Sequence, residues 1–159
     1  MKTVFQLRRR ALAALLSEHK VDALLITCPA NWYYLTGFTG EAGALIVSRK
    51  GTTLVTDGRF MVQGREETSG VSILQQKNSL LESVVQFLRD SSLRRTGFDP
   101  GQLTVAQMRS LRRGKGGRVQ WVAAAGVVES LRVRKDEGEL AQMRRAAVLA
   151  GEIDRKSVV

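Results

Sequence analysis

Short apolar runs separated by turn-forming residues mark the strands that the sequence predicts. Three of them, at residues 23–27, 44–47 and 52–55, are rich in Leu, Ile, Val and Thr, as buried strands are. Further strands are predicted at residues 71–74, 94–98 and 119–122. The second and third runs flank Ser48-Arg49-Lys50-Gly51, which predicts a β-hairpin because Gly51 can adopt a positive φ.

Apolar residues at helical spacing predict helices between most of these strands. Several of the helices begin with Ser or Thr followed three residues later by Glu or Gln, which is the spacing of a capping box. These pairs are Thr3/Gln6, Ser79/Glu82 and Thr104/Gln107. The helices are predicted at residues 3–19, 61–67, 79–90 and 104–113. In the first helix, the apolar stripe leaves Arg8, Arg9 and Arg10 mostly facing water.

The alternation of helices and strands predicts an α/β fold. The hairpin adds an antiparallel pair, so we expect a mixed sheet with flanking helices. Residues 136–153 differ, because they form a charged helix whose apolar stripe has no later element to cover it. The stripe consists of Leu140, Met143, Ala147 and Ala150. We therefore predict one domain at residues 1–134, followed at residues 135–159 by a linker and the first helix of a truncated second domain.

The charge balance adds an alternative to this picture. The chain of 159 residues has a formal net charge of +10. A basic run lies at Arg109, Arg112, Arg113, Lys115 and Arg118. This balance is typical of proteins that bind nucleic acid, but a solvated basic face, or a fragment that lacks its acidic half, has the same charge. A free-standing basic module that binds nucleic acid or another acidic polymer is therefore one alternative function.

Targeting and cysteine signals are sparse. No apolar run approaches the length of a bilayer span, and the N-terminal stretch is predicted to be an amphipathic helix rather than a signal peptide. The protein is therefore predicted to be cytoplasmic and not to bind a membrane.

The single cysteine, Cys28, excludes an internal disulfide and a cysteine-based zinc cluster. The single histidine, His19, is expected at a helix end, where a cation is favourable.

Aromatic side chains crowd one segment that is predicted to be a loop. Residues 31–38 contain four aromatic residues in eight positions. Full burial of Trp32, Tyr33 and Tyr34 together is unfavourable, because each polar ring atom needs a hydrogen-bond partner. One or two of these side chains are therefore expected to face a groove or another subunit.

A second candidate segment, Asp57 to Phe60, directly follows a predicted strand, where α/β proteins place their chemistry. The Arg59 guanidinium could hold a carboxylate or a carbonyl group by paired hydrogen bonds. It could instead pair with Asp57 or Glu41 and lock the turn. The glycines between residues 37 and 43 do not have the spacing of a phosphate-binding loop.

A metal cluster is not predicted, because the carboxylates that could form one are scattered along the sequence. These are Asp22, Glu41, Asp57 and Asp99.

Several motifs together resemble the N-terminal domain of the creatinase/prolidase family, and within it the Xaa-Pro peptidases of the aminopeptidase P and proline dipeptidase type. The resemblance covers nearly the whole chain. Its residues are Asn31, Tyr34-Leu35-Thr36-Gly37-Phe38-Thr39-Gly40, Gly43, Thr56-Asp57-Gly58-Arg59-Phe60, Gln63, Gly97-Phe98-Asp99, residues 130–137 and Arg144-Arg145-Ala146. The family often has tyrosine where this chain has Phe60, so any hydrogen bond from that hydroxyl is absent here.

The resemblance implies a ribonuclease-H-like α/β domain that is followed in the full protein by a pita-bread catalytic domain. That second domain would hold two divalent metals, often manganese, and would hydrolyse proline-containing peptides. This chain would then carry no catalytic and no metal-binding residue. Its expected partners are its own catalytic domain and a second subunit of a homodimer. The candidates for substrate access or an interface are Asn31, Trp32, Tyr34, Phe38, Asp57, Arg59 and Phe60.

Overall fold

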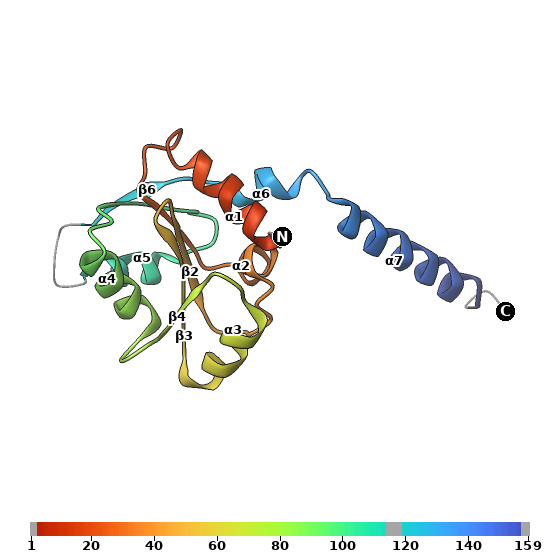
Figure 1. The fold of residues 1–159 in the computed structure, drawn as a ribbon, viewed down its shortest axis with the longest axis horizontal. Coiled ribbons are helices and arrows are strands. Elements are labelled where there is room, and N and C mark those ends of the chain that lie inside the picture. The colour runs from red at the N-terminus through yellow and green to blue at the C-terminus, as the bar shows by residue number, and fades with distance from the viewer. Residues whose placement is uncertain (1–2, 114–118, 157–159) are drawn as a thin grey trace.

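The computed structural model describes residues 3–113 and 119–156, and in this part the strands form one mixed sheet (Figure 1). The strand order is β4-β3-β2-β1-β5-β6. The pairs β1/β2 and β2/β3 are antiparallel, whereas β3/β4, β1/β5 and β5/β6 are parallel. The strands are β1 (Ala23–Ile26), β2 (Ala44–Ser48), β3 (Gly51–Thr56), β4 (Ser72–Gln75), β5 (Arg95–Phe98) and β6 (Gln120–Ala123). The mixed α/β fold predicted from the sequence is confirmed.

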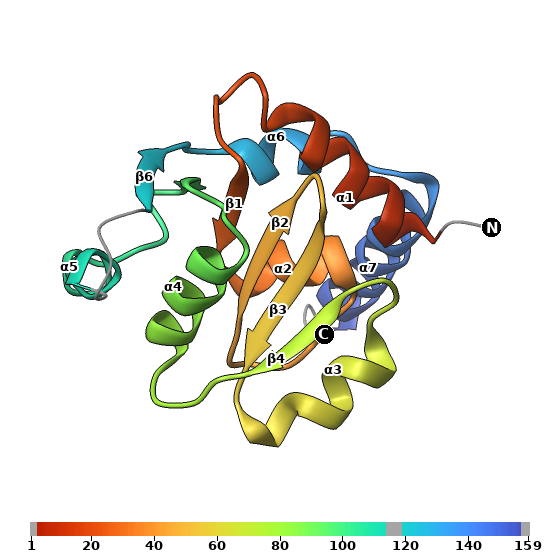
Figure 2. The ribbon, with the colours of Figure 1, turned by 60° about the vertical axis from the view of Figure 1, so that its left-hand side comes forward.

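Helices cover both faces of this sheet, and the alternation of strand side chains divides the core into two clusters (Figure 2). One face packs against α1 (Val4–Leu15), α2 (Pro29–Thr36) and α6 (Val127–Arg132). The other packs against α4 (Leu80–Asp90) and α5 (Val105–Arg113). Between β3 and β4 the chain forms a short 3-10 helix, η1 (Gly58–Phe60), and α3 (Met61–Glu67).

The predicted helix starts agree with the observed caps. Thr3 and Gln6 form a reciprocal capping box at α1, and Thr104 and Gln107 form another before α5. The first helix is shorter than predicted, because it ends at Leu15 and the chain then turns, with Lys20 at a φ of 53°. His19 therefore lies in this turn and not in the last turn of the helix.

The segment predicted as an aromatic loop is a helix, so that prediction was wrong. Pro29 lies in the first turn of α2, where its missing N–H costs nothing, and Gly37 ends the helix with a φ of 80°. The pairing of a starting proline and a closing glycine was the sequence signal for this helix. The prediction that Arg8, Arg9 and Arg10 mostly face water was wrong for two of them, because Arg9 is buried and only 12% of the Arg8 side chain is exposed.

Helix α7 (Glu137–Lys156) projects away from the sheet and its flanking helices (Figure 1). It follows α6 after a short connection and corresponds to the charged helix predicted at residues 136–153. Its apolar side chains Met143, Val148 and Leu149 are exposed. No helix in the described ranges has the length and apolar character needed to cross a membrane.

Candidate functional site

The turn after β3 presents a charged pair at the protein surface. Asp57 caps η1, because its Oδ1 accepts a hydrogen bond of 2.9 Å from the Arg59 backbone N–H. The Arg59 side chain is 77% exposed, and its Nη2 lies 2.7 Å from Asp57 Oδ2. The guanidinium also lies 5.2 Å from the centre of the Phe60 ring. Of the partners predicted for Arg59 within this chain, Asp57 is the one that the structure pairs with it.

The pairing fixes the charges of both groups. The hydrogen bond from the Arg59 side chain lowers the pKa of Asp57, and the same bond raises the pKa of Arg59. Both groups are therefore charged at neutral pH. The Nε and Nη2 atoms of Arg59 are used by Asp57, whereas Nη1 has no hydrogen-bond partner among the residues that the structure describes. This edge of the guanidinium is available to another molecule.

A polar cluster anchors the loop after α2 to α3, beside this turn. Glu67 accepts hydrogen bonds from the Thr39 backbone N–H at 2.8 Å and from the Thr39 hydroxyl at 2.7 Å. The Gln63 amide donates to the same hydroxyl at 2.8 Å and to Glu67 at 3.0 Å. Desolvation acts to raise the pKa of Glu67, but these hydrogen bonds outweigh it, so the pKa is lowered. The loop between residues 37 and 43 is thus held in one position.

The aromatic candidates lie mostly in the core. Trp32, Tyr34 and Phe38 are buried, whereas Tyr33 is 53% exposed. That one of these rings faces a groove or another subunit stays a prediction. Phe38 packs edge-on against Phe60, with the ring centroids 6.2 Å apart. Phe38 therefore supports the Asp57–Phe60 turn from beneath.

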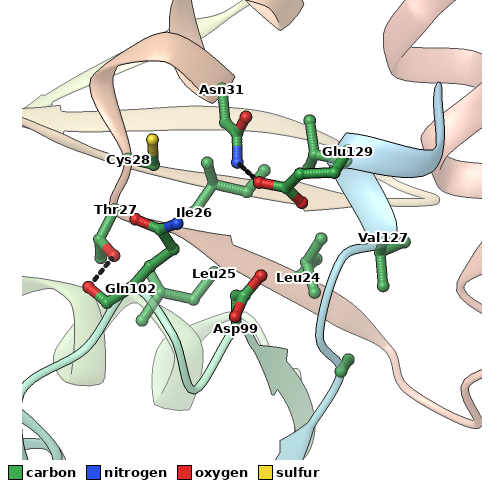
Figure 3. A pocket seen from close by; sticks show the side chains of 12 residues that line it. Leu24, Leu25, Ile26, Thr27, Cys28, Asn31, Asp99, Gln102, Val127 and Glu129 are labelled. Atoms are coloured by element: carbon green, nitrogen blue, oxygen red, sulfur yellow. Dashed lines mark hydrogen bonds between the residues drawn. The ribbon is translucent and has the colours of Figure 1, made fainter. Parts of the chain in front are cut away.

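Asn31 and Tyr34 join α2 to α6. The buried Asn31 amide donates to Glu129 Oε1 at 2.7 Å and accepts a hydrogen bond of 2.8 Å from Arg132 Nη1 (Figure 3 shows the Asn31–Glu129 bond). The Tyr34 hydroxyl donates to the Leu131 carbonyl at 3.3 Å. Burial raises the pKa of Tyr34, so its hydroxyl remains protonated. In this chain, both residues hold the segment that leads toward α7.

A small hollow lies where β1 and β5 end, between Asn31, Asp99, Gln102 and Glu129 (Figure 3). Ligands of α/β sheets often bind at such an edge. The hollow has a volume of only about 10 Å3, which is about the space of one water molecule. Asp99 is already occupied, since it accepts a hydrogen bond of 2.8 Å from Gly101 N in its own turn and one of 3.0 Å from Gly126 N at the start of α6. This hollow is therefore too small for a substrate.

The carboxylates considered for a metal site do not meet. Asp22 accepts hydrogen bonds from the backbone N–H groups of Arg94 and Arg95, Asp57 pairs with Arg59, and Asp99 caps turns. In the described ranges, no group of three or more His, Cys, Asp or Glu side chains could hold a metal ion.

The basic run of the nucleic-acid alternative is only partly described. Arg109, Arg112 and Arg113 are exposed on α5, while Lys115 and Arg118 lie outside the described residues. Trp121, the nearby aromatic residue, is half-buried and packs edge-on against Phe98. It is therefore poorly placed as a stacking platform for bases. Binding of an acidic polymer remains a prediction.

Comparison with known proteins identifies the domain. The sequence model of the Creatinase/Prolidase N-terminal domain matches residues 8–134. The uncharacterized peptidase YqhT of Bacillus subtilis is 29% identical over 135 residues, which span 85% of this chain and 38% of that protein. The chain spans well under half of the length of the curated relatives it matches.

Solved structures have the same fold. The N-terminal domain of cytoplasmic peptidase PepQ from Mycobacterium tuberculosis is 29% identical, with a TM-score of 0.74, and the match covers 79% of this chain and 98% of that one. The Xaa-Pro dipeptidase from Bacillus anthracis, at 23% identity, shares the fold with a TM-score of 0.81, and the match covers 86% of this chain and 38% of that one.

The structure therefore defines a mixed α/β domain whose exposed charged turn rests on an aromatic core. The chain belongs to the creatinase/prolidase N-terminal domain family.

Proposed function

We propose that this chain is the non-catalytic N-terminal domain of a cytoplasmic Xaa-Pro metallopeptidase, and that it narrows substrate access and contributes to dimer contacts. The observation that carries the proposal is the family match over residues 8–134, joined with relatives named as Xaa-Pro peptidases. One of the similar structures, PepQ, is described as a cytoplasmic peptidase. The partners would be the protein's own catalytic domain, a second subunit and a proline-containing peptide.

The catalytic metals belong to the proposed second domain and not to this one. Metal-assisted hydrolysis needs several protein ligands around one ion, with an open position for water. Asp22, Asp57 and Asp99 are committed to backbone caps, turns or an ion pair, and no group of three or more His, Cys, Asp or Glu side chains in the described ranges could hold a metal, so these residues do not fit two divalent ions such as manganese. The contribution of this domain would be to shape the approach of the peptide.

Arg59 is the residue best placed to make that contribution. Its backbone is fixed at a strand end, and the buried Phe38 ring supports the neighbouring Phe60. Asp57 holds one edge of the guanidinium and leaves the Nη1 edge toward solvent. A peptide carbonyl or a terminal carboxylate is a suitable acceptor for that edge. The acceptor could belong to substrate at the active site of either subunit.

The test is Arg59→Lys in the longer protein that contains the catalytic domain. Lysine keeps the charge but loses the planar fork, so we expect kcat/KM for an Xaa-Pro peptide to fall about tenfold or more. The thermal midpoint should stay unchanged, because the Arg59 side chain is 77% exposed and lysine keeps its charge. Arg65→Lys on α3 is the matched control, since Arg65 is also exposed, and it should leave kcat/KM unchanged.

Asp57→Asn separates the cap of the turn from the ion pair with Arg59. Asparagine caps a helix as well as aspartate does, so the turn is kept while the ion pair is lost.

A fall in thermal stability of Arg59→Lys with unchanged kinetics would show that Arg59 only locks the turn. If neither stability nor kinetics changes in Arg59→Lys, the proposed role of Arg59 is wrong.

A further inference from the structure

The segment that leaves the domain is attached to α1 and α2 at successive points. The first are the bonds from Asn31 and Tyr34 to α6 described above. The last is made by Arg8, whose guanidinium contacts the first turn of α7. Arg8 and Asp136 are 128 residues apart in the sequence, so this contact joins the first and last described helices.

Arg8 is held on several sides. Only 12% of its side chain is exposed. The guanidinium carbon lies 4.0 Å from the centre of the Tyr34 ring, and Nη1 donates to the Tyr34 carbonyl at 3.0 Å. Nη2 donates to Asp136 Oδ2 and lies 3.1 Å from Glu139 Oε2. A shielded guanidinium that bridges a ring, a carbonyl and two carboxylates is far more restricted than an ordinary surface ion pair.

The two carboxylates that contact Arg8 also start α7. The Asp136 backbone N–H donates to Glu139 Oε2 at 3.0 Å, and the Glu139 backbone N–H donates to Asp136 Oδ1 at 2.9 Å. This reciprocal pair is a capping box, so the positions of both carboxylates are tied to the axis of the helix. Any movement of that axis must move the groups that Arg8 holds.

We propose that Arg8 is a positioning residue that fixes the direction in which α7 leaves the domain. Beyond its first turn the helix projects away from the domain (Figure 1), so its direction depends on the contacts of that turn. The consequence for an enzyme rests on the function proposed above, because the direction of α7 would set where this domain lies over the following one. The direction itself is a property of this chain alone.

The experiment measures the spread of α7 orientations by the distance distribution between two spin labels. Cys28 is replaced by Ser, and labels are attached to Glu66→Cys on α3 and Ala147→Cys on α7, both of which are exposed positions. Labelled protein is diluted with unlabelled protein, so that only distances within one molecule are recorded. Arg8 is then tested by Arg8→Ala, and Arg10→Ala, at an exposed position on the same helix, is the control.

A second variant separates the tether, that is, the contacts of Arg8 with Asp136 and Glu139, from the capping box of α7. Asp136→Asn combined with Glu139→Gln keeps residue types that form a capping box, but it removes both charges that face Arg8. We expect one narrow distance peak for the parent chain and for Arg10→Ala. We expect that peak to be lost in Arg8→Ala and in the double variant, while circular dichroism shows the same helix content.

Two outcomes overturn the proposal. One is a broad distribution in the parent chain, which would mean that α7 is not held. The other is a narrow peak that survives in Arg8→Ala and in the double variant, which would mean that other contacts hold it. Neither outcome depends on peptidase activity, so the measurement remains decisive if the proposed enzymatic function is wrong.

Discussion

Replacing Arg9 tests how a buried cation stabilises this fold. Arg9 is 6% exposed on the inner side of α1, and burial lowers its pKa. Nη1 donates to the Leu35 carbonyl at 2.8 Å, and Nη2 donates to the Ser69 carbonyl at 2.6 Å. Leu35 lies in the last turn of α2, where carbonyls lack partners within the helix. Arg9 therefore satisfies the end of α2 and links it to the loop before β4.

Arg9→Met keeps the unbranched stem and removes the charge and both hydrogen bonds. A hydrogen bond from a charged donor contributes about 1.5–3 kcal/mol. The Leu35 bond is buried and belongs at the upper end of this range, while the Ser69 bond is partly exposed and belongs at the lower end. Allowing for non-additivity of neighbouring bonds, we expect a loss of about 3 kcal/mol in the free energy of unfolding.

The assay is urea unfolding of the 159-residue chain, followed by circular dichroism. Arg10→Met is the matched control, because Arg10 is exposed on the same helix, and its effect should lie within about 0.5 kcal/mol. A loss below about 1 kcal/mol in Arg9→Met would refute the reasoning. It would mean that water replaces the guanidinium at both carbonyls without cost.

Two further predictions concern the loop beside Phe38 and the tether to α7. A Cβ added at Gly40 would lie 2.2 Å from Phe38 Cζ. Gly40→Ala should therefore lower the free energy of unfolding by about 2 kcal/mol in the same urea assay. An unchanged unfolding midpoint would contradict the packing of Gly40 against Phe38. Hydrogen bonding from the Glu139 backbone N–H, followed by that from Arg8, lowers the pKa of Asp136 below its ordinary value, so the tether should be intact at neutral pH. Because a lowered folded-state pKa makes the carboxylate stabilising above its unfolded pKa, this stabilisation should decline below about pH 4 and disappear as pH falls through the folded pKa. The label distance distribution should broaden over that range in the parent chain and be independent of pH in Arg8→Ala, and equal broadening in both chains would contradict this assignment.

The strands and the hairpin were predictable because their signals are local. Residues 44–47 and 52–55 combine apolar runs with a turn at Ser48–Gly51, and the observed β2–β3 hairpin pairs Ser48 with Gly51. The turn at Asp57 was also predictable, since a carboxylate and a glycine directly follow a strand. In each case, residues close in sequence decide the structure.

The errors about the arginines of α1 arose because these residues contact distant parts of the chain. The burial of Arg9 depends on carbonyls at Leu35 and Ser69, and no pattern within α1 indicates them. The role of Arg8 depends in the same way on Asp136 and Glu139. Helix α2 was missed for a different reason, because its aromatic residues do not form a clear amphipathic stripe, although Pro29 and Gly37 mark its ends.

The central claim is that this domain is non-catalytic and that a second domain carries the catalytic site, and a peptidase assay tests this claim most directly. The chain and the proposed longer protein, which would contain this chain and a catalytic domain, are purified in parallel and given an Xaa-Pro peptide with manganese. We predict that the longer protein releases product, and that the chain alone neither releases product nor gains thermal stability from the metal. Turnover by the chain that persists through further purification would contradict the claim, as would a longer protein that cleaves no Xaa-Pro peptide.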